Sequence, residues 1–183
     1  HSGSPTMTNV TFSGNTASSG GGMKCGLLTS TMANVTFSGN TASNTGGGMY
    51  IYMPLHNGNI SMTNSILWGN FPEEIAGDDY FIADDDITLT YSDIQGGFEG
   101  EGNIDADPLF CDADNGDFTV SAGSPVLGTG QDGADMGAFG VGCETDVFGC
   151  TGESSCNYNP DAIVDDGSCI YPDENYDCYG NCL

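Results

Sequence analysis

The chain has 183 residues, of which 26 are acidic and one, Lys24, is basic, so its formal net charge is −25. Binding to nucleic acid or to an anionic membrane surface requires clustered Lys and Arg, and this composition therefore excludes both as partners. The sequence contains no run of apolar residues long enough to cross a bilayer, which predicts no membrane insertion. Copies of so acidic a chain repel one another unless salt or divalent cations screen them. We therefore expect an extracellular or cell-surface location with abundant ions.

The chain is long enough for one sizeable domain and an appendage. Its hydrophobic content of 38% is low, and its 29 glycines predict short strands and tight turns. It begins at His1 inside a repeat and shows no signal peptide. We therefore expect a processed form or a fragment of a longer protein.

One decapeptide, NVTFSGNTAS, stands at Asn9–Ser18 and again at Asn34–Ser43. A third copy, NSILWGN, begins at Asn64, and a degenerate fourth, YSDIQGG, begins at Tyr91. The offsets are 25 (34 − 9), 30 (64 − 34) and 27 (91 − 64) residues. Periods of this size indicate a solenoid, in which each repeat is one coil of a stack.

Each repeat has the alternation of a half-buried strand. Val10 and Phe12 alternate with Thr11 and Ser13, so the two apolar side chains lie on one face. Glycine runs at 20–22 and 46–48 each precede a Met that begins a second short strand. Parallel stacking would bury a column of Val, Phe, Ile and Met and would align Asn residues in two predicted ladders: Asn9, Asn34 and Asn64, and Asn15, Asn40 and Asn70.

The repeat with its following GGGM resembles the right-handed parallel β-helix proteins, in particular the secreted and surface bacterial branch with polymorphic outer-membrane-protein-like repeats. The passages NSILWGNFPEEI, ITLTYSDIQGGFEGEGNIDADPLF and GDFTVSAGSPVLGTG with DMGAFG are similar to closing coils of that group. The resemblance covers residues 1–142 and implies an all-β fold, a right-handed parallel β-helix. It implies no particular activity, because β-helices include lyases, hydrolases, adhesins and inert stalks.

The tail, residues 143–183, is predicted to be a small disulfide-rich, loop-rich module. Six of the eight cysteines lie after residue 140, and no CxxC pair indicates zinc, so disulfides in an oxidising compartment are favoured. From Gly149 the tail also resembles a short cysteine-containing module found near the C-termini of secreted bacterial proteins. The sequence leaves the pairing open among these candidates: Cys111, Cys143, Cys150, Cys156, Cys169, Cys178 and Cys182.

Calcium is the candidate cofactor. The tail places oxygen ligands at Asn157, Asn159, Asp161, Asp165 and Asp166, and alternating side chains of this kind suit a hard cation. The match to an EF-hand loop is partial, and a disulfide-held turn rich in Asx residues is the alternative.

Two further acidic sets are weaker candidates for cation binding. One is Asp112, Asp114 and Asp117 around Asn115, for which an Asn-Gly turn between strands is the favoured interpretation. The other is Asp84, Asp85 and Asp86, for which a solvated loop is favoured.

Catalysis is disfavoured, because no nucleophile, base and stabiliser can be identified together. A polysaccharide lyase would have only Lys24 as its base. A glycoside hydrolase would need paired carboxylates, for which Asp85 with Asp86 and Asp105 with Asp107 are available. Four aromatic residues could instead form a sugar-stacking surface: Tyr50, Tyr52, Trp68 and Phe71.

Three Asn residues, Asn9, Asn34 and Asn59, begin N-glycosylation sequons. Asn9 and Asn34 belong to a predicted ladder, which favours an intramolecular hydrogen-bonding role for them. Asn59 lies outside the ladders.

The sequence favours an extracellular structural or adhesive β-solenoid that is not an enzyme. No amphipathic helix is predicted to cover the first coil, so its edge is a template for end-to-end or side-by-side self-association into a cation-dependent filament. The main alternative is a carbohydrate-binding or carbohydrate-cleaving module of a larger secreted protein, with an extracellular polysaccharide or protein surface as partner. A passive spacer is a third interpretation.

Overall fold

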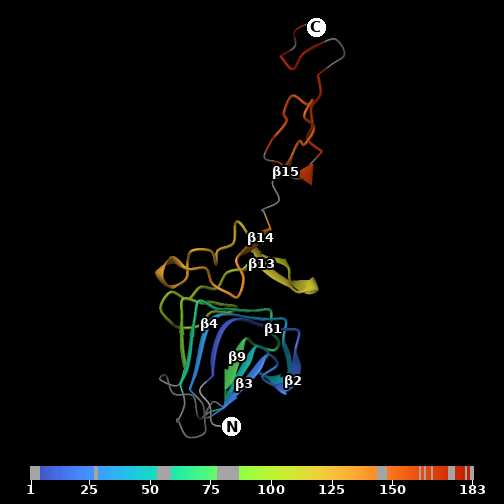
Figure 1. Cartoon of the computed structure of the whole chain (residues 1–183). Coiled ribbons are helices and arrows are strands. Elements are labelled where there is room, and N and C mark those ends of the chain that lie inside the picture. Colours follow the sequence, from blue (N-terminus) through green and yellow to red (C-terminus); the bar gives the residue numbers. More distant parts are fainter. Residues whose placement is uncertain are drawn as a thin grey trace. The chain divides into compact units, whose positions relative to one another are not determined.

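A computed structural model describes residues 5–26, 29–52, 59–77, 87–143, 148–160, 162, 164–165, 167–172, 176–179 and 181. The chain divides into two compact units, His1–Cys143 and Glu144–Leu183 (Figure 1). Cys143, the last residue of the first unit, is joined by a disulfide to Cys111 within that unit.

The first unit is a parallel β-solenoid, which confirms the predicted fold class. The first coil has β1 (Thr6–Ser13), β2 (Thr16–Ser19) and β3 (Met23–Gly26). The second has β4 (Ser30–Ser38), β5 (Thr41–Thr45) and β6 (Met49–Tyr52). The third has β7 (Ile60–Thr63), β8 (Ile66–Trp68) and β9 (Ile75–Gly77), and the fourth has β10 (Ile87–Thr90) and β11 (Asp93–Ile94).

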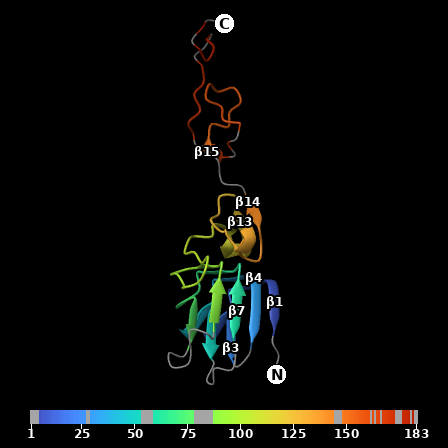
Figure 2. The same ribbon diagram turned by 90° about the vertical axis from the view of Figure 1, so that its left-hand side faces the viewer.

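The repeats pair in the register that their sequences predict. β1 pairs with β4 so that Val10 lies on Val35 and Phe12 on Phe37, and Figure 2 shows β1, β4 and β7 side by side in one sheet. Leu67 and Ile94 continue the Phe column in the third and fourth coils. Parallel pairing at a constant offset therefore converts the repeated sequence into continuous columns.

The columns form the apolar core of the coils. Phe37 is fully buried, and its ring stacks on that of Phe12 with centroids 4.7 Å apart and planes within 10°. A second column joins Met32, Met62 and Leu89 through the pairing of β4, β7 and β10. Burial of these side chains, each worth about 1.5–3 kcal/mol, holds together coils that could not form a core alone.

The two sets of stacked Asn residues have different roles. Asn9, Asn34 and Asn64 have positive φ angles of 56°, 54° and 49°, and so form a left-handed corner in each coil. Tyr91 has the same conformation in the fourth coil, at φ 49°, which matches its predicted place in the repeat.

The predicted ladder of side-chain amides at this corner is wrong for Asn34 and Asn64. Asn34 donates from Nδ2 to the Asp135 carbonyl at 3.2 Å. Asn64 accepts at Oδ1 from the Gln131 amide at 2.7 Å. The corner turns these side chains outward, where they bond to the backbone of a later segment.

The second set forms the predicted ladder. Asn15 donates from Nδ2 to Asn40 Oδ1 at 2.9 Å, and Asn40 donates from Nδ2 to Asn70 Oδ1 at 2.8 Å. Backbone amides of Asn15 and Asn40 donate to the same acceptors at 3.0 and 2.9 Å. The ladder ends on the carboxylate of Glu74, which accepts from the amide and Nδ2 of Asn70. We call Asn15, Asn40, Asn70 and Glu74 the Asn spine.

A closing segment, residues 110–143, covers the outer face of the sheet that contains β1, β4, β7 and β8. It contains β12 (Phe110–Asp112), the 3₁₀ turn η1 (Ala113–Asn115), β13 (Asp117–Ser121), the 3₁₀ turn η2 (Gln131–Gly133) and β14 (Val141–Cys143). Val120, Val126 and Met136 pack on Ile66 in a second apolar cluster. The Ala138 amide also donates to Thr36 Oγ1 at 2.9 Å. The segment thereby fixes the β12–η1–β13 hairpin against the coils.

The second unit has two short strands, β15 (Phe148–Gly149) and β16 (Val164–Asp165), which pair in parallel. Disulfides join Cys150 to Cys169 and Cys156 to Cys178. Across the described parts of both units, no helix is long and apolar enough to cross a membrane.

Candidate functional site

The candidate site is a groove of about 600 Å³ in the first unit. It lies at a second corner of the coils, different from the corner at Asn9, Asn34 and Asn64, where the strands β1, β4 and β8 end. One wall is formed by Ser13, Gly14, Ser38, Gly39, Trp68 and Gly69. The other wall is formed by Phe110, Phe118 and the turn 113–116. We call this the corner groove.

The first wall is made by the glycine of each repeated Gly-Asn pair. Gly14, Gly39 and Gly69 have φ angles of 62°, 64° and 74°. This left-handed conformation turns the following Asn inward into the Asn spine and leaves the glycine exposed. A Cβ added at Gly14 or Gly39 would meet no atom within 4 Å, so the space above the turns is open.

Trp68 breaks the repetition of this wall. It pairs with Ser38 in the sheet, where the first two coils have only serine. The indole is half-buried and packs beside the second apolar cluster. A large aromatic side chain therefore stands beside a row of glycine turns.

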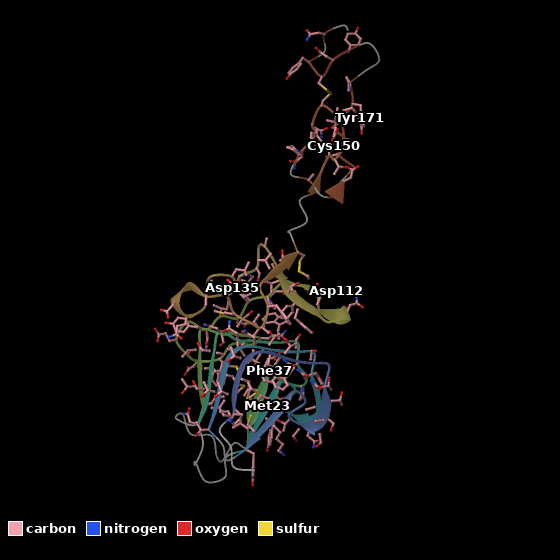
Figure 3. All side chains as sticks on the ribbon, viewed as in Figure 1. Met23, Phe37, Asp112, Asp135, Cys150 and Tyr171 are labelled. Atoms are coloured by element: carbon pink, nitrogen blue, oxygen red, sulfur yellow. A yellow bond between two sulfur atoms is a disulfide. The ribbon has the colours of Figure 1, made fainter. Side chains whose placement is uncertain are left out.

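The second wall is the hairpin of the closing segment, on which Figure 3 labels Asp112. Phe110 and Phe118 pack edge to face with centroids 5.4 Å apart and planes at 88°. The Asn115 amide donates from Nδ2 to both oxygens of Asp112, at 2.9 and 2.8 Å. Gly116, at φ 84°, then reverses the chain into β13. The turn is thus held by its own hydrogen bonds.

The predicted acidic set of this hairpin is divided between turn and groove. Asp112 is bonded to Asn115, and Asp117 accepts from the amide of Thr119 at 3.0 Å. Hydrogen bonds from the Thr119 hydroxyl, which has the larger effect, and from the Thr119 amide lower the pKa of Asp117. Asp114 alone of the three lines the corner groove. Within the described residues, no three His, Cys, Asp or Glu side chains are grouped as a metal site requires.

The tail candidates for calcium are in part hydrogen-bonded. Asn157 accepts at Oδ1 from the Ile170 amide and donates from Nδ2 to the Ser168 carbonyl, both at 2.8 Å. Asp165 accepts from the Gly167 amide at 3.0 Å. The Asn159 backbone amide donates to the Cys150 carbonyl at 2.9 Å. Asp161 and Asp166 lie outside the described residues, as do Asp84, Asp85 and Asp86.

The residues considered for catalysis are dispersed. Lys24 lies on β3, where its ammonium sits 5.0 Å from the ring centroid of Tyr50. Asp105 accepts from the Gly96 amide at 3.1 Å, and Asp107 accepts from the Leu109 amide at 2.9 Å. Both carboxylates thus support turns between β11 and β12.

The candidate aromatic residues are not one surface. Tyr50 is 9% exposed, whereas Tyr52 is 41% exposed and Phe71 is 66% exposed. Of the four, Trp68 alone lines the corner groove. Its partners there, Phe110 and Phe118, were not predicted, because they come from a segment far along the chain.

Two buried carboxylates also escaped prediction. Asp93 is fully buried and pairs with Ile66 of the preceding coil, where the repeat has an apolar residue. Its Oδ1 accepts from the Ala106 amide at 3.1 Å. Its Oδ2 has no hydrogen-bond partner among the described residues. Burial raises the pKa of Asp93 to about 7, with nearby acids adding to the shift. Burial also raises the pKa of Glu74 at the end of the Asn spine.

The cysteines confirm the prediction of disulfides. Cys111 pairs with Cys143, and the other two bonds lie in the second unit. Cys182 lies outside the described residues. Cys25, on β3, is a buried free thiol whose pKa is raised to about 11 by burial.

These features define a parallel β-solenoid repeat protein with a disulfide-bonded second unit. Residues 34–50, which contain the second copy of the decapeptide and its glycine run, match the Chlamydia polymorphic membrane protein repeat. The repeat is thus similar to that of a surface-protein family, which supports an extracellular structural role. Comparisons with curated proteins and with solved structures each gave no match.

Proposed function

We propose that this chain is an adhesive, structural β-solenoid of the cell exterior that stacks lengthwise into a cation-dependent filament. The observation that carries the proposal is the edge of the first coil. Among the described strands, β1, β2 and β3 each pair with one neighbour, namely β4, β5 and β6. Within the described residues their other edges pair with no strand, and an unpaired strand edge is a template for another strand.

The side chains at this edge support stacking. Val10 and Phe12 end the core columns and are half-buried, whereas Val35 and Phe37 one coil further on are fully buried. Asn15 is exposed at the end of the Asn spine. In Asn40 and Asn70 the side-chain Oδ1 accepts from the Asn of the preceding coil, so Asn15 Oδ1 is placed to accept from an Asn of an added coil. A second solenoid that stacked here would extend both the apolar columns and the spine.

Charge makes the assembly dependent on cations. A net charge of −25 on each copy opposes association until divalent ions or salt screen it. We propose calcium as the cation, bound at the Asx-rich loop around Asn157 and Asp165 and more weakly beside Asp114. Isothermal titration calorimetry tests this binding, and the absence of both heat and any shift in melting temperature would remove calcium from the proposal.

Sedimentation velocity tests the stacking directly. The wild-type protein is expected to form large species in millimolar calcium and to return to monomers in chelator. Val10→Glu places a carboxylate at the exposed end of a core column and is expected to remain monomeric. Thr88→Glu adds the same charge on the exposed outer face of β10 and serves as the matched control. Wild-type monomers in every buffer, or equal assembly by both variants, would contradict lengthwise stacking.

The corner groove favours one form of the alternative function, carbohydrate binding. The carbohydrate-cleaving form has a separate test, which is the release of unsaturated or reducing ends from acidic polysaccharides. We expect no release, because the groove lining presents one carboxylate, Asp114, and no basic side chain.

A further inference from the structure

The geometry of the corner groove points to a binding site for a neutral glycan. The inference concerns the adhesive part of the proposed function and rests on it, because an adhesive solenoid needs a surface that recognises a ligand. The groove shares one lining residue, Ser13, with the stacking edge of β1, β2 and β3, so a change at Gly39 in the second coil alters the groove without altering that edge.

The groove has the size and the repetition that a short oligosaccharide requires. Its volume of about 600 Å³ falls within the range of roughly 300–1,000 Å³ found for ligand sites. Its first wall repeats one Gly turn per coil, and successive strands of a sheet lie about 4.8 Å apart. An open wall with a regular repeat suits a ligand that is itself a chain of similar units.

The lining combines aromatic surface with hydrogen-bonding groups. Trp68 on one wall and Phe110 and Phe118 on the other supply apolar area for the C–H face of a sugar ring. The Asp114 carboxylate and the Ser13 hydroxyl can bond to sugar hydroxyls. A sugar ring has one apolar face and a polar rim, and both find partners here.

Charge excludes an acidic glycan. Asp114 is the single charged residue of the lining, and Lys24, the chain's one basic side chain, lies on β3 outside it. An anionic ligand would therefore meet repulsion in the groove and from the net charge of −25. A neutral ligand meets no such penalty.

The hydrogen bonding of the Gly turns disfavours a peptide strand as the occupant. A peptide that extends a sheet needs unpaired backbone groups along an edge. At this corner the Gly14 amide donates to the Ser38 carbonyl at 3.2 Å, and the Gly69 amide donates to Gln95 Oε1 at 2.8 Å. The Gly14 and Gly69 amides are therefore not available to a peptide, whereas the side-chain polar groups and the aromatic rings of the groove can still bind a ligand.

Intrinsic fluorescence tests the inference on the full chain, because Trp68 is its sole tryptophan. We would titrate neutral cello-, manno-, xylo- and N-acetylchito-oligosaccharides, and then screen an array of neutral and acidic glycans. A neutral glycan is expected to bind and to shift Trp68 emission. If no neutral glycan binds, or if acidic glycans alone bind, the inference is wrong.

A pair of glycine variants locates the binding. Gly39→Asn adds a side chain in the open groove, and Asn tolerates the left-handed φ of 64° at this position. Gly128→Asn has the same open surroundings and a φ of 66°, but lies outside the groove. We expect Gly39→Asn to raise the Kd about tenfold, which corresponds to about 1.4 kcal/mol, and Gly128→Asn to leave it unchanged.

The outcomes separate this inference from lengthwise stacking. Glycan binding that Gly39→Asn does not weaken would place the ligand elsewhere and overturn the assignment to the groove. Sedimentation of the same two variants in calcium is expected to match wild type, since neither change touches the first-coil edge. Loss of glycan binding by Gly39→Asn with normal assembly thus supports the assignment of the ligand to the groove. Normal glycan binding by a wild-type protein that does not assemble would contradict the filament proposal and leave the glycan site unaffected.

Discussion

The coils and the second unit reach a folded state by different means. The coils bury complete columns of Met, Val, Phe and Ile, with a free thiol, Cys25, among them. In the second unit the described residues that are buried are Gly149, Cys150 and Ser155. A unit this small lacks an apolar core and needs covalent bonds, whereas repetition gives each coil a core that its neighbours complete.

The largest expected effect comes from reduction of the disulfides. The two bonds of the second unit close sequence separations of 19 and 22 residues, and each is worth about 3 kcal/mol by loop closure. We expect the described residues of the second unit to lose hydrogen-exchange protection in reductant while β4 and β7 keep theirs. Simultaneous loss in both units would show that the coils also depend on a disulfide.

Removal of one rung of the Asn spine is expected to affect the coils alone. Asn40→Ala deletes the acceptor of Asn15 and a donor to Asn70 and to the Phe12 carbonyl. Unpaired buried groups of this kind cost about 1–3 kcal/mol each. We expect a loss of about 3 kcal/mol in urea unfolding, against less than about 0.5 kcal/mol for the exposed Asn44→Ala control. Equal effects would mean that the spine contributes little.

A smaller effect is expected from Asp93 and depends on pH. Burial raises its pKa from 3.8 to about 7 in the folded chain, so the unfolded chain releases this proton at lower pH. The contribution of Asp93 to stability is therefore greatest below about pH 4 and is lost as the pH rises through 7, at up to about 1.4 kcal/mol for each pH unit between the two pKa values. Asp93→Asn should remove that part of the slope and stabilise the protein at pH 8.

Urea unfolding at pH 4.5, 6 and 8 measures the slope for both proteins. Asp132→Asn, an exposed change of equal charge, controls for the general repulsion among acidic groups. A wild-type slope that Asp93→Asn leaves unchanged would contradict the assignment of the titration to Asp93.

The smallest expected effect is the inertness of Cys25. Its thiol is buried, and burial raises its pKa to about 11; the thiolate is the reactive form. We expect a disulfide reagent to leave Cys25 unlabelled in the native, oxidised protein and to label it after denaturation, with the labelled residue located by peptide mapping. Rapid labelling of Cys25 in the native protein would show that β3 opens readily.

The sequence was sufficient for the fold because the repeat carries the register. Identical residues must occupy equivalent positions in a stack, so Val10 on Val35 and Phe12 on Phe37 follow from the offset. Even the degenerate fourth copy aligned correctly, with Tyr91 in the corner conformation of Asn64. The role of each Asn did not follow, because the φ angle that turns Asn34 outward is not encoded by residue type alone.

The corner groove could not be predicted in the same way. Its first wall follows from the Gly-Asn pairs, but Phe110 and Asp114 reach it through the irregular closing segment, which has no repeat to fix its path. The pairing of Cys111 with Cys143 depends on the same path. Asp93 had one available signal, an acidic residue at the repeat position of buried Ile66.

Electron microscopy of the native protein, with and without calcium, tests the central claim most directly. A structural solenoid that stacks by its first coil predicts calcium-dependent filaments whose strands lie across the long axis, with a repeat of about 4.8 Å along it. Monodisperse single particles in calcium at physiological salt, with no lengthwise repeat, would contradict it.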